Sequence, residues 1–271
     1  MISARAAFQR CVDVCAEEGL AQFAVVNRCM IGIVDALQGL PYDGLAVLAE
    51  ARGVAHALRN RVAETMAYET EGMLLLMCGR YDRARETLPL GLALARETGA
   101  RRFEAIILSD LAWVTLHYGD REAARLQAQA AWQICSEVGP RFSGPIALAV
   151  LAATAASAEE RDRALADGER LLEAGCIAHC HLDFYAQAID LALGAHAWAE
   201  AERYAACLEA FTRPEPLPYC DLLVSRGRAL AAAGRGRADR DALEDCRRRA
   251  LAMRVAPLVP ALDAALAALE S

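Results

Sequence analysis

The chain has 271 residues, of which 56% are hydrophobic, and it carries 29 basic and 36 acidic side chains for a formal net charge of −7. Nucleic-acid binding usually needs a basic surface, so this balance argues against nucleic acid as the main partner. Every basic residue is an arginine. The chain therefore lacks the lysine that a phosphate-binding loop, a Schiff base or a Ser-Lys nucleophile requires.

No segment has the length and hydropathy of a membrane-spanning helix. The most apolar segment, Ile146 to Ala158, is interrupted by Thr154 and Ser157. The first residues, Met1 to Arg5, lack the apolar centre of a signal peptide. We therefore expect a cytoplasmic protein with no membrane partner, in which ten scattered cysteines act mainly as small buried hydrophobic residues.

The first predicted element, within residues 1–19, is one helix without a preceding partner. An apolar stripe runs along it, made of Phe8, Cys11, Val12 and Cys15. Its residues match, in steps of forty, the second helix of the hairpins that follow. We therefore interpret residues 1–19 as the second helix of a truncated repeat, and we expect further protein before Met1.

Residues 20–175 read as four regular helical hairpins of about forty residues each. The clearest copy is Tyr68, Gly72, Leu75, Gly79, Tyr81, Ala84, Leu88 and Gly91, and the next is Leu108, Ala112, Thr115, Gly119, Arg121, Ala124, Ala128 and Ala131. Small residues recur where two helix axes come closest, at Gly72 and Ala84 in the first of these copies. This pattern predicts an all-α fold, an α-solenoid that resembles the tetratricopeptide repeat with longer helices.

The turns inside these hairpins are predicted from their own residues. They are Gly79-Arg80-Tyr81-Asp82 and Gly119-Asp120-Arg121-Glu122. Glycine can take the left-handed conformation that ends a helix, and aspartate is a common N-cap. We therefore expect Asp82 and Asp120 to cap the second helix of each hairpin.

The forty-residue period is lost in the second half of the chain. Residues 176–256 read as two irregular repeats, joined by an extended connector at 212–218 because three prolines alternate there. Residues 257–271 read as a C-terminal capping helix with one apolar face.

Residues 175–230 also carry a resemblance to a known family. The matching segments are Gly175-Cys176-Ile177-Ala178-His179-Cys180-His181, Phe184-Tyr185, Trp198 to Ala206, Phe211 to Pro218, and Arg226 to Leu230. They resemble the C-terminal tetratricopeptide region of bacterial class III adenylate/guanylate cyclase proteins, in which a cyclase domain and an AAA-type ATPase module precede the repeats. The resemblance implies a sensory or scaffolding role and carries over no catalytic residue, because the catalytic motifs of that family lie outside this chain.

No catalytic motif and no cofactor site is evident. Cys176, His179, Cys180 and His181 have the donor types of a zinc site, yet structural zinc sites usually take ligands from two separate segments. We favour packing and helix capping by the histidines over metal binding.

The candidate binding groove lies one residue along from the core stripe of each hairpin's first helix. We assign to it Glu69, Met73, Met77, Ser109, Trp113 and His117. Methionine and tryptophan are frequent at adaptable binding surfaces. Burial of the same residues against the next repeat is an equal alternative.

From these features we predict a non-catalytic module that binds a protein or peptide, including the parent protein's own ATPase and cyclase modules. The alternative is a sensor that holds an apolar small molecule in the groove.

Overall fold

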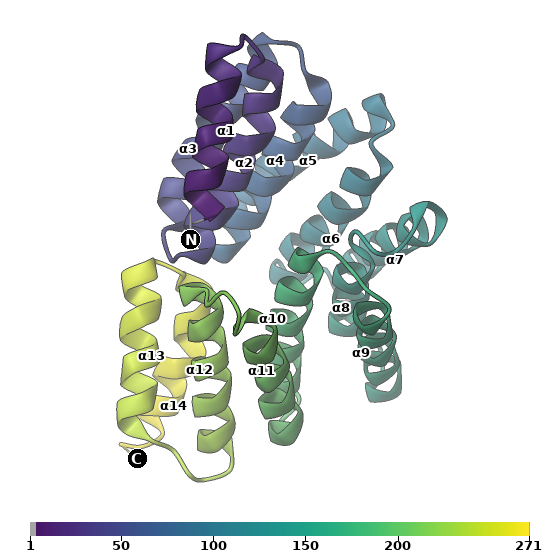
Figure 1. Cartoon of the computed structure of the whole chain (residues 1–271). Helices are drawn as coiled ribbons and strands as arrows, with labels where there is room; N and C mark the ends of the chain where they lie inside the picture. Colours follow the sequence, from purple (N-terminus) through teal and green to yellow (C-terminus); the bar gives the residue numbers. More distant parts are fainter. Residues whose placement is uncertain (1–3, 271) are drawn as a thin grey trace. The chain divides into compact units, whose positions relative to one another are not determined.

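The computed structural model describes residues 4–270, which form α-helices, one short 3-10 helix and no strand (Figure 1). The helices are α1 (Ala4–Glu17), α2 (Ala21–Leu37), α3 (Pro41–Ala57), α4 (Arg61–Met77), α5 (Tyr81–Thr98), α6 (Arg101–His117), α7 (Arg121–Val138), α8 (Gly144–Thr154), α9 (Ala158–Glu173), α10 (Ala178–Gly194), α11 (Trp198–Thr212), α12 (Pro218–Gly234), α13 (Arg240–Met253), η1 (Ala256–Leu258) and α14 (Val259–Ala267). The predicted all-α class is confirmed.

The chain forms two compact units, unit 1 (Met1–Ile134) and unit 2 (Cys135–Ser271), and the boundary falls inside α7. Within unit 1, consecutive helices pack as hairpins from α1 to α6, and α2, α4 and α6 also pack side by side. Unit 2 repeats this plan, with α10 beside both α8 and α12, and α12 beside α14. Each unit is therefore a solenoid of helical hairpins whose even-numbered helices form a shared layer, called the inner layer below.

The helices of the regular repeats end every twenty residues in a left-handed residue. These residues are Gly19, Gly39, Arg59, Gly79, Gly99, Gly119 and Gly139. At Gly39 the Schellman hydrogen bonds are present, from the amide of Gly39 to the Ala36 carbonyl and from that of Leu40 to the Asp35 carbonyl, both at 2.9 Å. Arg59 takes the same role with a φ of 54°, a conformation that costs a non-glycine residue about 1–2 kcal/mol.

The two predicted caps differ in outcome. Asp120 caps α7, since its Oδ1 accepts from the Ala123 amide at 3.0 Å. Asp82 does not cap α5: Arg80 holds the N-cap position, and Asp82 lies in the first turn, where it accepts from the Tyr118 hydroxyl. The reason is spacing, because Asp120 directly follows the left-handed glycine whereas Asp82 comes three residues after Gly79.

The small-residue positions mark close helix contacts. In the first hairpin, a Cβ added to Gly44 would lie 2.5 Å from the Gly32 carbonyl oxygen, so the two backbones touch. In the next hairpin, Gly72 faces the side chain of Leu88 rather than Ala84, which the sequence had suggested as its partner.

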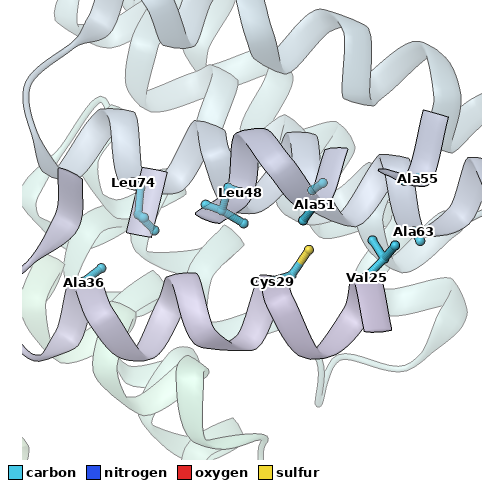
Figure 2. Packing of buried hydrophobic residues seen from close by; sticks show 9 residues of the cluster. Val25, Cys29, Ala36, Leu48, Ala51, Ala55, Ala63 and Leu74 are labelled. Carbon is cyan, nitrogen blue, oxygen red and sulfur yellow. The ribbon is translucent and has the colours of Figure 1, made fainter. Parts of the chain in front are cut away.

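Small residues also build the core of unit 1. Figure 2 shows Val25, Cys29 and Ala36 of α2 packed against Leu48, Ala51 and Ala55 of α3, with Ala63 and Leu74 of α4 beside them. Alanine lets three helices approach closely while leucine fills the remaining space. Helix α1 packs in a separate cluster, in which Phe8, Val12 and Cys15 meet Ala24 and Ile31 of α2, whereas Cys11, predicted in the same stripe, is exposed.

Unit 2 contains the irregular elements. Helix α11 ends at Thr212 and α12 begins at Pro218, so the proline-rich segment is the connector between them. The C-terminal element starts as a 3-10 turn at Ala256 and continues as α14, with Leu258 and Leu262 buried. Across residues 4–270, no helix is both long enough and apolar enough to span a bilayer.

A glycine inside a helix and a glycine with a positive φ should change the free energy of unfolding in opposite directions when replaced by alanine. Gly53 lies inside α3, and a Cβ added there meets nothing within 4 Å, so Gly53→Ala should raise the free energy of unfolding by about 0.5–1 kcal/mol. Gly79 has a φ of +71°, so Gly79→Ala should lower it by about 1 kcal/mol. Urea unfolding followed by circular dichroism measures both. Shifts of the same sign would contradict the assigned turn.

Candidate functional site

The candidate site lies on the inner layer of unit 1, on the side of α2, α4 and α6 that neighbouring helices leave open. Its residues are Val26, Ile33 and Leu37 of α2, Val62, Met66, Met73 and Met77 of α4, and Trp113 of α6; together they are called the apolar strip. Val26 and Val62 are 41% and 52% exposed, and the other members are half-buried. Because Ile33, Met73 and Trp113 are forty residues apart and their helices pack side by side, they form a row across the layer.

The predicted groove and the observed strip overlap in part. Met73, Met77 and Trp113 belong to the strip, whereas Glu69 is 8% exposed and Ser109 is fully buried. The structure differs from the prediction here because a step back of four residues turns the helix surface by about 40°, toward the neighbouring helix. Ser109 hydrogen-bonds within its own helix, to the Ala105 carbonyl at 3.1 Å. Val26, Val62 and Met66 were missed, although helical periodicity alone places them beside Met73 and its equivalents.

His117, the last predicted groove residue, is exposed at the end of α6 but its ring is engaged. It stacks on Tyr81 with ring centroids 3.6 Å apart and an angle of 12° between the ring planes. The stack ties the end of α6 to the start of α5. His117 therefore borders the strip as a packing group.

The strip also contributes to the core. Met66, Met73 and Met77 pack by part of their surface against the cluster shown in Figure 2. Trp113 is half-buried, and its indole N–H is buried with no hydrogen-bond partner. An unsatisfied donor of this kind costs about 1–3 kcal/mol.

Buried carboxylates in unit 1 connect consecutive repeats. Glu64 and Glu104 are forty residues apart, and both are more than nine-tenths buried. The Nδ1 atom of His56 lies 3.0 Å from the Glu64 carboxylate, and Arg96 Nε donates to that of Glu104 at 2.9 Å. Each pair joins the end of an odd-numbered helix, called an outer helix below, to the start of the next inner helix: α3 to α4 and α5 to α6. These carboxylates therefore stabilise the stacking of the repeats, and they are not arranged as an acid and base around a cleft.

The cysteine–histidine segment of unit 2 does not converge on one point. His179 Nε2 and Cys180 Sγ lie 2.6 and 3.0 Å from the Phe142 carbonyl oxygen. His181 instead stacks on Phe211, with centroids 4.3 Å apart. Among residues 4–270, no three His, Cys, Asp or Glu side chains are grouped so as to hold a metal ion. The N-cap of α10 is Ile177, so the histidines pack without capping the helix.

The inner layer of unit 2 is polar where that of unit 1 is apolar. Arg226 of α12 is 6% exposed; its Nη1 donates to Asp190 of α10 at 2.5 Å, and its Nε donates to the Leu258 carbonyl at 3.1 Å. Nearby on α10, burial raises the pKa of Asp183 to about 6, and the charge of His179 opposes this rise. Burial also raises the pKa of Tyr219. The ion pair between Arg226 and Asp190 therefore joins α12 to α10.

Comparison with known families did not identify the chain. No protein-family model matches it. No curated protein shows a significant match either. The resemblance to the cyclase-associated repeat region therefore stays a hypothesis carried by the residues given above.

Two replacements of Trp113 separate its ring from its N–H. Trp113→Phe keeps an aromatic ring and removes the unsatisfied donor, so the free energy of unfolding should stay within about 1 kcal/mol of wild type. Trp113→Ala removes the ring and should cost about 2–3 kcal/mol, less than for a fully buried ring because the residue is half-buried. Thermal and urea unfolding report both values. Equal losses would show that the N–H is satisfied in solution.

The raised pKa of Asp183 predicts a pH dependence. Since the folded pKa, about 6, exceeds the ordinary value of 3.8, the folded state holds a proton that the unfolded state releases in that interval. The stabilisation is complete below about pH 4 and is lost as the pH rises through 6. Asp183→Asn should flatten this part of the stability profile and raise stability at pH 7 relative to wild type. An unchanged slope between pH 4 and 6 would contradict the assignment.

Proposed function

We propose that this chain is a non-catalytic helical-repeat module that binds an apolar face of a peptide or protein segment on the apolar strip of unit 1. In keeping with the resemblance to cyclase-associated repeats, it serves as the sensory or scaffolding part of a cytoplasmic cyclase–ATPase signalling protein. Its partner is a segment of another protein or of the parent's own upstream modules.

The observation that carries the proposal is the row of aliphatic and methionine side chains on α4. Val62, Met66, Met73 and Met77 are spaced four, seven and four residues apart, so they share one helix face. Solvent reaches all four. Contiguous exposed apolar surface is uncommon on monomeric proteins and marks interaction sites.

The strip is not explained by folding alone. The hairpin of α4 and α5 is closed by Leu75, Ala84 and Leu88, which are at most 5% exposed. Met66, Met73 and Met77 pack with only part of their surface against the neighbouring core cluster of α2, α3 and α4. Methionine has three rotatable bonds and a polarizable sulfur, which suits a surface that adapts to different apolar partners.

Peptide binding is the favoured mode because the strip crosses three parallel rows of side chains, from α2 through α4 to α6. An amphipathic helix presents apolar residues at positions i, i+3, i+4 and i+7, which matches a surface of this kind. No motif for nucleotide turnover lies in the sequence, so the module acts through binding and the chemistry belongs to its partners.

A direct test uses a fluorescein-labelled amphipathic peptide of leucine and lysine and measures fluorescence anisotropy at 0.15 M salt. Met66→Gln/Met73→Gln replaces two strip residues with polar side chains of similar length. The dissociation constant should rise by about tenfold or more, since loss of central apolar contacts typically costs over 1 kcal/mol. The unfolding free energy of the double variant should fall by less than about 2 kcal/mol, because both residues are half-buried.

Leu90→Gln is the matched control, because Leu90 is 53% exposed but lies on the outer helix α5. It should leave peptide affinity unchanged. A scrambled peptide of the same composition tests whether the acidic chain merely attracts lysine. If the wild-type chain binds neither peptide but binds one molecule of a hydrophobic dye at the strip, the small-molecule sensor replaces this proposal.

A further inference from the structure

A second feature of unit 1, separate from the apolar strip, is an open surface formed by α1 and α2. Outer helix α3 packs on the inner helices α2 and α4, and α5 packs on α4 and α6. In the part of the chain that the structure describes, α1 packs mainly on α2. Within that part, one side of α1 and the adjoining side of α2 therefore lack the helix that covers the corresponding sides in the later repeats.

The forty-residue repeat shows which side chains this arrangement leaves open. Cys11 is exposed and Val14 is 54% exposed. Their equivalents in the later outer helices are mostly buried: Ala51, Gly91 and Ala131 for Cys11, and Leu94 and Ile134 for Val14. On α2, Phe23 is 55% exposed, whereas its equivalent Ala63 is 3% exposed. Positions that belong to the core in the later repeats thus form an exposed patch of Cys11, Val14 and Phe23, called the α1 face below.

The charges of α1 run against the helix dipole. Arg5 lies in the first turn and Glu17 is the last residue, although the dipole favours acidic residues at the start and basic residues at the end. Arg5 Nε donates to Asp35 at 2.6 Å, which compensates one of these charges. Arg10 and Glu17 are seven residues apart and share one side of α1, and within residues 4–270 neither forms an ion pair. A helix with this order of charges attracts a second copy of itself that runs in the opposite direction.

We propose that two copies of this chain associate through the α1 face, with their α1 helices antiparallel about a twofold axis close to Val14. The axis passes midway between Arg10 and Glu17, so Arg10 of each copy lies against Glu17 of the other. Val14 meets its counterpart beside the axis. Phe23, in the first turn of α2, packs over the first half of the opposing α1 helix. The contact therefore combines an apolar centre with two symmetric ion pairs at its rim.

The size of this contact predicts a weak dimer. Helix α1 has 14 residues and is about 21 Å long. A contact along one helix of this length, extended by Phe23, buries less than the roughly 800 Å² per partner that is typical of stable complexes. We therefore expect association in the micromolar range, with the monomer dominant in dilute solution.

Sedimentation velocity of the full chain, from about 1 to 200 μM, measures the association. Wild type should show a monomer–dimer equilibrium. Val14→Gln should raise the dissociation constant of the dimer by about tenfold or more, because the lost apolar contact is central and occurs twice in each dimer. A wild-type chain that stays monomeric over the whole range would overturn the proposal.

Leu90→Gln is the matched control for Val14→Gln. Leu90 is 53% exposed and lies on the outer helix α5, which is packed on both neighbouring inner helices. The dissociation constant of this variant should equal that of wild type, and far-UV circular dichroism checks that both variants keep their helix content. Equal weakening by the two changes would show that the α1 face is not the contact.

Charge reversal tests the antiparallel order and the identity of the partner. Arg10→Glu and Glu17→Arg should each weaken self-association by about tenfold, because each sets like charges opposite one another. A mixture of these two variants restores both ion pairs, so it should form a mixed dimer with nearly the wild-type affinity. A mixture that associates no better than either variant alone would exclude this pairing of two copies and leave the face to a helix of another protein.

The strip variant Met66→Gln/Met73→Gln separates this dimer from the binding proposed for the apolar strip. It should dimerise like wild type, because neither residue lies on the α1 face. Loss of the dimer in this variant would assign the association to the strip and overturn the proposal.

Discussion

The architecture depends on one backbone constraint, the left-handed residue that ends each helix of the regular repeats. With such a residue every twenty positions from Gly19 to Gly119, helices α2 to α6 are 17 or 18 residues long and are joined by very short turns. Schellman hydrogen bonds satisfy carbonyl groups at these ends, so none of these turns needs additional structure. Similar lengths and similar turns allow each inner helix to pack on its equivalent in the next repeat.

That packing leaves the inner helices little surface. Helix α4 contacts α3, α5, α2 and α6, so most of its circumference is buried and even Glu64, Glu69 and Glu71 are less than a tenth exposed. The chemistry of an inner helix is then decided by the few positions that remain open. On α4 these positions include Arg61 and Tyr68 and, within the apolar strip, Val62, Met66, Met73 and Met77. Because the core is already supplied by other positions, the apolar character of the strip residues must be explained by something that binds them or by partial packing, and the exposure of Val62 favours binding.

The all-α class could be predicted from the sequence because glycine spacing and helical periodicity are local signals. The turns at Gly79 and Gly119 were predicted correctly, since glycine is the residue that takes the left-handed conformation without strain. The sequence could not show that Arg59 and His196 take the same conformation, because tertiary packing imposes it on residues that disfavour it. The predicted cap at Asp82 was wrong because Asp82 lies three residues after Gly79, inside the first turn of α5. Its side chain instead accepts from the Tyr118 hydroxyl, a contact between repeats that no local pattern encodes.

The candidate site was predictable only to within one helix face. The forty-residue repeat identifies equivalent positions, so it predicted that Met73 and Trp113 share a face. It does not predict how much of that face a neighbouring helix covers. Glu69 and Ser109 lie on the covered edge and Met66 on the open one, a distinction of a few tens of degrees that depends on how closely alanine and glycine let the helices approach.

In unit 2 the inner layer is polar instead of apolar, because Asp183, Asp190 and Arg226 occupy it. A buried arginine is held there by a carboxylate and a backbone carbonyl, and breaking such a set leaves an uncompensated charge. Polar inner positions that satisfy one another fix helices in place, whereas apolar inner positions that remain open are available to a partner. On this physical ground we propose that the binding surface lies in unit 1, and that the inner layer of unit 2 mainly holds its own helices together.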